Sequence, residues 1–531
     1  MKRISAIAIL IILIASLFAG CTSVKSETKH EETISRLTVG TTMAVNDLNI
    51  EDYDLGILRG QMTHQGLVKL GPDGGFVPAL AESWETADSK RWTFNLVKNA
   101  TFHDGTPVTS KDVKFNLEYL PAKIAQYKTH WSLIESVETP DDYTVVINLK
   151  SPCSNFLVNL LVLRTIPEHI FKDVEDPVKY NDVKATIGCG PYKFDGFDKN
   201  AGVLTFKAYD GYHGKKPAIG EIEIRMFKNP DTMVMALQKG EVDTTYIYSK
   251  GISYYYVPRL LASDDITIMT VKNTGVPNAL WFNGNKSPFN DTRFRVAISY
   301  AIDYEELNNL FTAGYGSAPN AGFIPEGSFN YIETRKLSRD LNKSKEMLDA
   351  IGMKDIDGDG FRETPDGRKF QPELITRTDN PDNVRVADMM KKYLASAGID
   401  VRVKAADKNT VREILDVKKS HDMAVTGTTP WGMMMWANYG TGYIDSRNIG
   451  YSMTGDPEFH AMIDELLKTS DSQRSGELAR DIQNYYADNL PAIPLYWNDN
   501  IQPHKSEYEG WVNDPMYGIM SYGTFYELHR A

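Results

Sequence analysis

Cysteine is scarce in this sequence, with three among 531 residues, which excludes a small fold held together by many disulfides. Two of them, Cys153 and Cys189, lie well inside the chain. In an exported protein these two residues either form one disulfide or stay as two buried free thiols. Their spacing does not choose between the alternatives.

Basic runs and catalytic motifs are also missing. The chain has 58 Lys and Arg against 70 Asp and Glu, a net charge of −12, and such an acidic surface argues against a nucleic-acid partner. We find no HExxH, GxSxG, Walker A or CxxC pattern, and the ten histidines are scattered. A ligand-binding protein is therefore expected rather than an enzyme. An extracytoplasmic hydrolase and a surface sensor or adhesion module stay as alternatives, because acid and base groups can converge from distant segments.

Long apolar runs are absent after the first twenty residues. Two cationic residues precede the apolar stretch 4–19, which predicts a signal peptide over residues 1–20. The small residues before Cys21 resemble a lipobox, so we expect this cysteine to carry the lipid that anchors the protein to the membrane. Plain cleavage without a lipid and an uncleaved anchor are the alternatives. The polar residues 21–35 predict a flexible tether. The folded part is then expected on the outer face of the cytoplasmic membrane, periplasmic or extracellular.

What the sequence does contain is an alternation of strand-like and helix-like segments, which predicts an α/β fold. Residues 92–96 alternate apolar with polar side chains, as in a half-buried strand. From residue 291 the apolar positions recur at helical spacing. Residues 386–394 repeat that pattern, Gly398 ends the helix, and residues 399–403 alternate as the next strand.

Four sequence blocks resemble a known family. The segment AESWETADSKRWTFNLVKNATFHDGTPVTSKDVKFNLEY, residues 81–119, is similar to the hallmark segment of the family 5 extracellular solute-binding proteins, which serve peptide and nickel importers. Further blocks agree in the same order: IGCGPYKF from Ile187, NDTRFRVAISYAIDYEEL from Asn290 and LPAIPLYW from Leu490. The resemblance covers nearly the whole chain after the tether.

The resemblance implies a two-lobed, periplasmic-binding-protein-like fold of the class II type. The first lobe is expected at residues 36–275 and 480–531, with an extra subdomain at about 63–184, and the second lobe at 276–479. The protein is expected to act as a monomer that closes on a peptide or a metal chelate and presents it to the permease of an ABC importer. No cofactor is required for that role.

The resemblance also suggests ligand contacts. In the peptide branch a second-lobe Asp commonly pairs with the peptide amino terminus, but here no acid follows Gly427 until Asp445. The nickel branch has a Trp-Gly pair at this place, as Trp431-Gly432 here, and an Arg whose planar guanidinium holds a chelator carboxylate. The ligand-binding residues implied in this way are Arg164, His130, Trp131 and Trp431. Trp436 and Tyr439 extend the aromatic region after Trp431 and are further candidates. Alternatively, Arg164 makes an internal ion pair and Trp431 packs in a wall.

One acidic segment has the spacing of a calcium loop. Oxygen donors stand at positions 1, 3, 5, 9 and 12, with Gly360 at position 6, where the loop turns sharply. The Asp at position 12 replaces the usual bidentate Glu, which weakens binding. A structural calcium ion and a solvated acidic turn are both consistent with this pattern. The six predicted ligands are Asp355, Asp357, Asp359, Phe361 through its carbonyl, Glu363 and Asp366.

Overall fold

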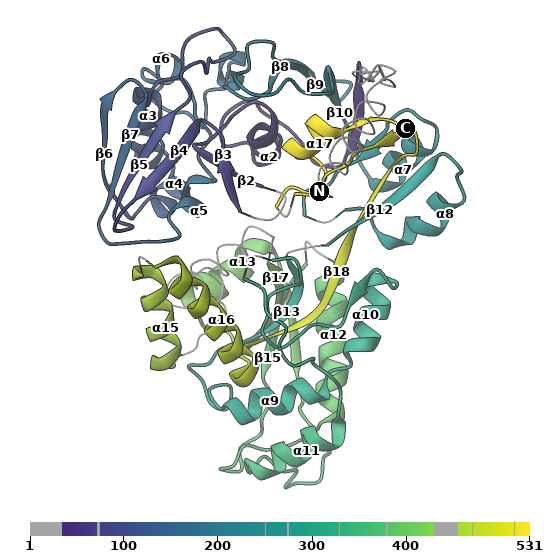
Figure 1. Ribbon diagram of the computed structural model, residues 1–531. Coiled ribbons are helices and arrows are strands. Elements are labelled where there is room, and N and C mark those ends of the chain that lie inside the picture. Colours follow the sequence, from purple (N-terminus) through teal and green to yellow (C-terminus); the bar gives the residue numbers. More distant parts are fainter. Residues whose placement is uncertain are drawn as a thin grey trace, which may run out of the picture.

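The computed structural model describes residues 34–531 apart from 72–74, 250, 273–274, 329, 379–380, 429–454, 470 and 515. Its helices and strands gather in two lobes, one above the other in Figure 1, and the long strand β18 (Ala492–Lys505) runs between them. This is the mixed α/β, two-lobed fold predicted from the sequence. In the described part, no helix has the length and apolar character needed to cross a membrane.

The main sheet, of 12 strands, extends through both lobes. Ten of these strands form its central path, and β12 (Ile266–Lys272) and β14 (Gly316–Ser317) pair with β18 beside it. In spatial order the path is β16 (Arg402–Ala406), β15 (Glu373–Arg377), β17 (Met423–Thr428), β13 (Val276–Phe282), β18, β11 (Thr244–Thr245), β1 (Leu37–Thr41), β10 (Glu221–Met226), β9 (Val203–Ala208) and β8 (Tyr192–Asp198).

Strand β18 joins the lobes because its two halves have different partners. Its first residues pair antiparallel with β13, where Ala492 lies opposite Trp281. Residues 499–505 pair antiparallel with β12. Since β12 and β13 follow each other in the chain, the connection between the lobes consists of two neighbouring extended segments.

A second, four-stranded sheet forms a separate body beside the upper lobe (Figure 1). Its order is β4 (Ala81–Thr86), β5 (Arg91–Leu96), β7 (Thr144–Leu149) and β6 (Ile134–Asp141). Trp92, Phe94 and Leu96 are buried, as the alternation in residues 92–96 predicts. They belong to a hydrophobic cluster of their own. The helices of this body are α3 (Ser110–Lys123), α4 (Ala125–His130), α5 (Leu157–Leu160), α6 (Glu168–Phe171) and the 3-10 turn η1 (Val183–Thr186).

The remaining elements complete the two lobes. The upper lobe contains α2 (Tyr53–Met62), β2 (Val68–Leu70), β3 (Phe76–Pro78), α7 (Pro230–Gln238), η2 (Tyr254–Tyr256), α8 (Val257–Leu261), β19 (Tyr508–Glu509), α17 (Tyr522–Glu527) and β20 (His529–Arg530). The lower lobe contains α9 (Thr292–Ala301), α10 (Tyr304–Thr312), α11 (Leu341–Ala350), α12 (Pro381–Ser396), α13 (Lys408–Arg412), the π-helix η3 (Glu413–Lys418), α15 (Pro457–Lys468) and α16 (Ser472–Asn489).

The predicted helices of the lower lobe are present. The apolar stripe of α9 is fully buried in the core of that lobe, and Asp291 caps the helix by accepting a hydrogen bond from the Arg293 N–H at 2.8 Å. The strand after α12 begins later than predicted, at Arg402 instead of residue 399. Arg402 donates its N–H to the Pro372 carbonyl, and Pro372 has no N–H with which to extend the ladder.

The four-stranded body touches the lower lobe directly. The Ser154 N–H donates to the Thr469 carbonyl at 3.2 Å, and the Asn155 side-chain amide donates to the Ser475 hydroxyl at 3.0 Å. Residues 154–155 precede α5, and Ser475 lies in the first turn of α16. The two lobes therefore meet through side-chain and backbone hydrogen bonds as well as through β18.

Cys153 and Cys189 are both buried and free. Cys153 packs in the hydrophobic cluster of the four-stranded body, whereas Cys189 packs in a small cluster with Leu80 and Phe102. Burial raises the pKa of each thiol to about 12. Of the two alternatives, the structure therefore has the free thiols and no disulfide, because each cysteine fills a different apolar cluster.

Candidate functional site

Arg164 lies in a notch on helix α2. Gly56 and Gly60 are one turn apart on this helix, and the guanidinium of Arg164 lies against both. Its Nε is 2.8 Å from the place that a Cβ on Gly60 would occupy, and its Nη1 is 3.0 Å from that of Gly56. The Arg164 side chain can occupy this position only because neither residue has a side chain.

Within the described part of the chain, no carboxylate forms an ion pair with Arg164. Tyr517 is a polar neighbour of Arg164: burial raises the pKa of this tyrosine, and the charge and hydrogen bond of Arg164 oppose that shift. Burial likewise raises the pKa of Glu51, and the charge of Arg164 again acts in the opposite direction. The alternative of an internal ion pair is thus not found among these residues.

A second guanidinium, that of Arg59, lies close to Arg164. Arg59 is 2% exposed, its Nη2 donates to the Leu48 carbonyl at 2.9 Å, and its Nη1 has no hydrogen-bond partner. Burial and the charge of Arg164 lower the pKa of Arg59 to about 10. Two like charges therefore lie in a poorly hydrated region, and the charges of Tyr127 and Asp52 oppose the lowering of the Arg59 pKa.

Trp131 and His130 lie near this region at the end of α4. Trp131 is 4% exposed, and its indole N–H donates to the Asn159 carbonyl at 2.9 Å. Its ring packs against Tyr127, with centroids 4.9 Å apart, and the charge of Arg164 opposes the burial that raises the pKa of Tyr127. Burial lowers the pKa of His130. The structure thus brings Trp131 into a cluster that includes Arg164, and a ligand contact by either residue stays a prediction.

The remaining predicted ligand contacts, Trp431, Trp436 and Tyr439, lie outside the described residues, as does Cys21. Strand β17 ends at Thr428, just before that segment.

A narrow cavity of about 40 Å³ opens beside Arg164 in the upper lobe. Its wall includes Arg164, Gln61, Lys69, Asp514, Tyr517 and Tyr522. These residues come from α2, the β2–β3 hairpin, the segment between α5 and α6, and the C-terminal segment that ends in the first residue of α17. The volume has room for only a few water-sized groups.

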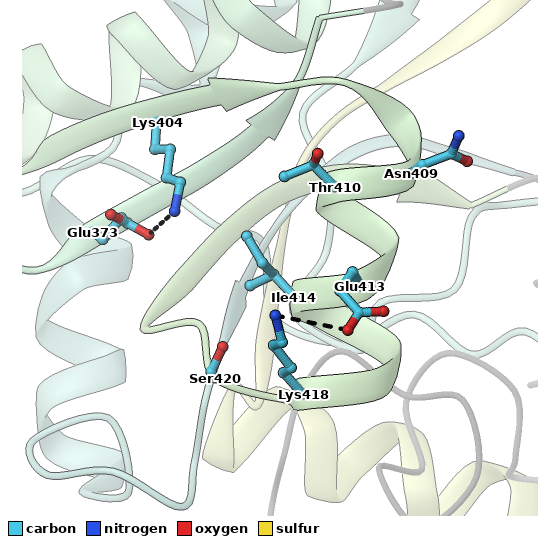
Figure 2. Close-up of a pocket in the computed structure, with 8 residues that line it drawn as sticks. All are labelled: Glu373, Lys404, Asn409, Thr410, Glu413, Ile414, Lys418 and Ser420. Carbon is cyan, nitrogen blue, oxygen red and sulfur yellow. Dashed lines mark hydrogen bonds and ion pairs between the residues drawn. The ribbon is translucent and has the colours of Figure 1, made fainter.

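A larger pocket of about 630 Å³ lies in the lower lobe, between β15, β16 and the α13–η3 segment (Figure 2). Two ion pairs lie in its wall: Lys404 Nζ lies 3.3 Å from Glu373 Oε1, and Lys418 Nζ lies 3.7 Å from Glu413 Oε1. Its lining consists of Glu373, Lys404, Asn409, Thr410, Glu413, Ile414, Lys418 and Ser420.

The acidic loop of the lower lobe brings together part of the predicted calcium ligands. Carboxylate oxygens of Asp355, Asp357 and Glu363 lie within 4.8 Å of one another. Asp355 accepts hydrogen bonds from the Gly360 N–H at 3.0 Å and from a second glycine, and φ of Gly360 is 92°. This turn is the one that the spacing predicts.

The other two carboxylates of the loop are engaged elsewhere. Asp359 lies 3.4 Å from the Lys369 ammonium, and Asp366 lies 2.8 Å from Nε of Arg368. The oxygen donors at positions 1, 3 and 9 therefore converge, whereas those at positions 5 and 12 face cations, and a calcium ion in this loop stays a prediction.

Sequence patterns did not single out Arg59, Gln61, Lys69, Tyr127 and Tyr517. The pair of glycines at i and i+4 in α2 was the one available signal, because two such residues on one helix face permit a close approach. The other residues become neighbours only through the fold.

Comparison with known proteins places this chain in a family. The chain matches the family described as bacterial extracellular solute-binding proteins, family 5 Middle, over residues 75–449. A putative ABC transporter peptide-binding protein of Brucella ovis is 28% identical over 348 residues, which are 63% of this chain and 61% of that protein. The oligopeptide-binding protein AppA of Bacillus subtilis is 26% identical over 463 residues, covering 82% of this chain and 81% of AppA.

A solved structure has the same fold as this chain. The crystal structure of NikA from Brucella suis in complex with Fe(III)-EDTA superposes with a TM-score of 0.79 at 22% identity, over 93% of this chain and 100% of that one. The aligned region spans about 61% of the Brucella ovis relative's length. Because the family match itself covers more than half of the residues, this chain belongs to the bacterial extracellular solute-binding proteins of family 5.

Proposed function

We propose that the protein is the ligand-capturing subunit of an ABC importer, which encloses a peptide or a metal chelate between its lobes and delivers it to the permease. The observation that carries this proposal is Arg164, a cation held in a helix notch beside a cavity without an ion-pair partner among the described residues. Family membership supports it, since the relatives carry the names of peptide-binding proteins and NikA was crystallised with a metal chelate.

The capture is proposed to work by closure of two lobes, which the sequence predicts at residues 36–275 with 480–531 and at residues 276–479; helix α16 extends the lower lobe to Asn489. The hydrogen bonds at Asn155 and Ser475 support this idea because they join the two bodies at a distance from β18. In hinge proteins, two lobes close around one ligand that both of them contact. No chemical change of the ligand is required.

We further propose that the chain is made with a signal peptide over residues 1–20 and is anchored through a lipid on Cys21. The polar residues 21–35 support this, since a tether of that length lets the folded part move above the membrane surface. Metabolic labelling with a radioactive fatty acid tests it: label is expected on the wild-type protein and not on Cys21→Ser. Label on the variant would place the lipid elsewhere.

Native mass spectrometry combined with thermal unfolding tests the capture itself. A co-purifying peptide or chelate is expected, and adding it back should raise the unfolding temperature, because a ligand that binds only the folded state stabilises it by mass action. The ligand should be recovered unchanged. Turnover of the ligand would favour a hydrolase instead, and binding of a partner protein without any small ligand would favour a sensor or adhesion module.

A structural calcium ion in the acidic loop is a separate proposal, supported by the convergence of Asp355, Asp357 and Glu363. Millimolar calcium is expected to raise the unfolding temperature by about one degree, roughly the effect of 1 kcal/mol in a chain of this size. Asp357→Asn should abolish that rise, whereas Asp366→Asn should not. An equal rise in all three proteins would assign the effect to general ion binding.

A further inference from the structure

Helix α10 of the lower lobe ends in a loop that crosses to the upper lobe. Tyr315 lies in this loop, directly before β14, and its carbonyl accepts a hydrogen bond from the Asp499 N–H at 2.8 Å. Asp499 is the residue at which β18 starts to pair with the upper-lobe strand β12. The loop is therefore attached to β18 at the point where this strand enters the upper lobe.

The ring of Tyr315 packs in the upper lobe. It stacks on Tyr254 of η2, with ring centroids 5.7 Å apart and an angle of 10° between the planes. Both rings pack against a hydrophobic cluster of the upper lobe that includes Leu260 and Ile266. The Tyr254 hydroxyl donates a hydrogen bond to the Asp499 carbonyl. Asp499 thus binds both tyrosines, one through its N–H and the other through its carbonyl.

The backbone around Tyr315 has little freedom. The two residues before it, Ala313 and Gly314, have φ angles of 48° and 90°, and such a left-handed conformation is uncommon for a residue other than glycine. After it, Gly316 lies so close to β18 that an added Cβ would be 2.3 Å from the Trp497 carbonyl oxygen. A strained turn persists where the surrounding contacts hold it, so the direction in which Tyr315 leaves α10 is fixed on both sides.

An ion pair also links the lobes near this place. The ammonium of Lys272, at the end of β12, lies 3.4 Å from a carboxylate oxygen of Asp499 and 3.9 Å from one of Glu326, a residue of the lower lobe. The side chains of Lys272 and Glu326 are 55% and 67% exposed, so water screens their charges. The stacked rings, which pack against an apolar cluster, are therefore the stronger of the two links.

The stack and the hydrogen bonds of Asn155 lie on opposite sides of β18. In Figure 1, α8 and α10 lie to the right of this strand, and the four-stranded body and α16 lie to its left. When two bodies rotate against each other, the atoms next to the axis move least. Because Tyr315 is bonded to β18 itself, the stack can persist through a rotation that separates Asn155 from Ser475.

We propose that Tyr254 and Tyr315 form the pivot of the molecule: the stacked rings keep the two lobes aligned while they open and close, and prevent them from twisting about β18. Both are positioning residues, which act on a ligand only through the orientation of the lobes. The proposal rests on the closure of the lobes proposed above. Without the stack, β18 and the connection from β12 to β13 would still join the lobes, but extended segments have many soft dihedral angles.

Distances between spin labels on the two bodies test the pivot in dialysed protein without added ligand. Glu135→Cys in the four-stranded body and Asn484→Cys in α16 place the labels at exposed positions. Cys153 and Cys189 are each 1% exposed and should not react, and Cys21 is changed to serine. Double electron–electron resonance then measures the distribution of the distance between the labels.

Tyr315→Ala and Tyr254→Ala should each raise the population outside the main distance about two- to tenfold, the effect expected from the loss of one aromatic pair. The double variant should broaden the distribution no further, because both single variants remove the same contact. Tyr315→Phe keeps the ring and should behave like the wild type. The matched control is Tyr255→Ala, which removes a neighbouring ring that is 81% exposed. Circular dichroism shows whether each variant is folded, and Tyr315→Leu replaces Tyr315→Ala if that variant does not fold.

Ionic strength separates the stack from the ion pair of Lys272. Raising the salt concentration from about 0.1 M to about 1 M shortens the screening length from about 10 Å to about 3 Å. The wild-type distribution should stay the same, and so should that of Lys272→Met, because stacked rings do not depend on screening. Broadening by salt and in Lys272→Met, with none in Tyr315→Ala, would assign the pivot to the ion pair and overturn the role of the tyrosines.

Two further results would overturn the proposal, and they differ in what else they overturn. If Asn155→Ala shifts the distance but the variants of Tyr254 and Tyr315 leave it unchanged, the pivot is wrong and the closure of the lobes stands. One fixed distance in all of these proteins, Asn155→Ala included, would show that the lobes do not move. That result would overturn the proposed closure, and the pivot with it.

Discussion

Two cavities in the described part of the molecule differ in how their charges are matched. In the lower-lobe pocket of Figure 2, each cation has an acidic partner: Lys404 has Glu373, and Lys418 has Glu413. In the narrow cavity of the upper lobe, neither Arg164 nor Lys69 has one among the described residues. The cations of the larger pocket are therefore paired, whereas those of the smaller cavity form no ion pair with a described carboxylate, although Asp514 also lines it.

This difference favours the upper-lobe cavity as the place where a ligand binds. Exposed ion pairs such as those of the lower lobe are screened by water and contribute roughly 0–1 kcal/mol each. A cation removed from water is costly unless an anion accompanies it. A ligand carboxylate would thus add little in the lower-lobe pocket but would supply the missing charge in the upper-lobe cavity. Unmatched charge, and not volume, is the better guide to the site here.

Of the variants that test this comparison, Arg164→Ala is expected to have the largest effect on ligand affinity. Its guanidinium offers a planar fork for a carboxylate, so its loss is expected to weaken the binding of nickel–EDTA about a hundredfold or more. Isothermal titration calorimetry measures this. The matched control is Lys404→Ala in the lower-lobe pocket, for which the affinity should stay within twofold. Unchanged chelate affinity in Arg164→Ala would remove this residue from the site.

Gly60→Ala should act on the same residue indirectly and somewhat less strongly. The added methyl group would meet Nε of Arg164 at 2.8 Å, and the flexible side chain would yield before the helix does. We expect an affinity loss of about tenfold, because a displaced guanidinium loses part of its hydrogen bonding. The free energy of unfolding should stay the same or rise by up to about 1 kcal/mol, since alanine favours the helix.

The matched control for this variant is Gly196→Ala, at a position in β8 where an added Cβ meets no atom within 4 Å. That variant should bind normally. If Gly60→Ala also bound normally, the notch would not position the guanidinium. A large loss of stability with Gly60→Ala would mean that the helix, and not Arg164, gives way.

Much of the fold could be predicted from the sequence, and the charge imbalance could not. The stripe of α9 and the alternation in β5 are local patterns, and the structure buries the residues that they single out. The start of β16 was predicted too early because its ladder depends on the partner strand, which begins after Pro372. Lys69 and Arg164 share a cavity only because a hairpin, a connecting segment and the C-terminal region converge, and no pattern along the chain encodes that.

The hydrogen bonds between Asn155 and Ser475 allow a test of whether closure of the lobes contributes to ligand binding. Asn155→Ala and Ser475→Ala each remove one side of a hydrogen-bond pair that joins the bodies. Each is expected to weaken ligand binding roughly two- to tenfold, the effect of a net hydrogen bond of 0.5–1.5 kcal/mol. The double variant should be no worse than either single one, because both remove the same contact. Additive losses would show that the two residues act independently.

The smallest effect is expected for Lys418→Ala in the lower-lobe pocket. The side chains of Lys418 and Glu413 are 62% and 49% exposed, and their pair is 3.7 Å long. Its removal should change the free energy of unfolding by less than about 0.5 kcal/mol and the ligand affinity by less than twofold, because water already screens both charges. Chemical denaturation and calorimetry measure the two quantities. A tenfold loss of affinity would reverse the comparison, since it would show that a ligand uses the charges of the lower lobe even though they are already paired.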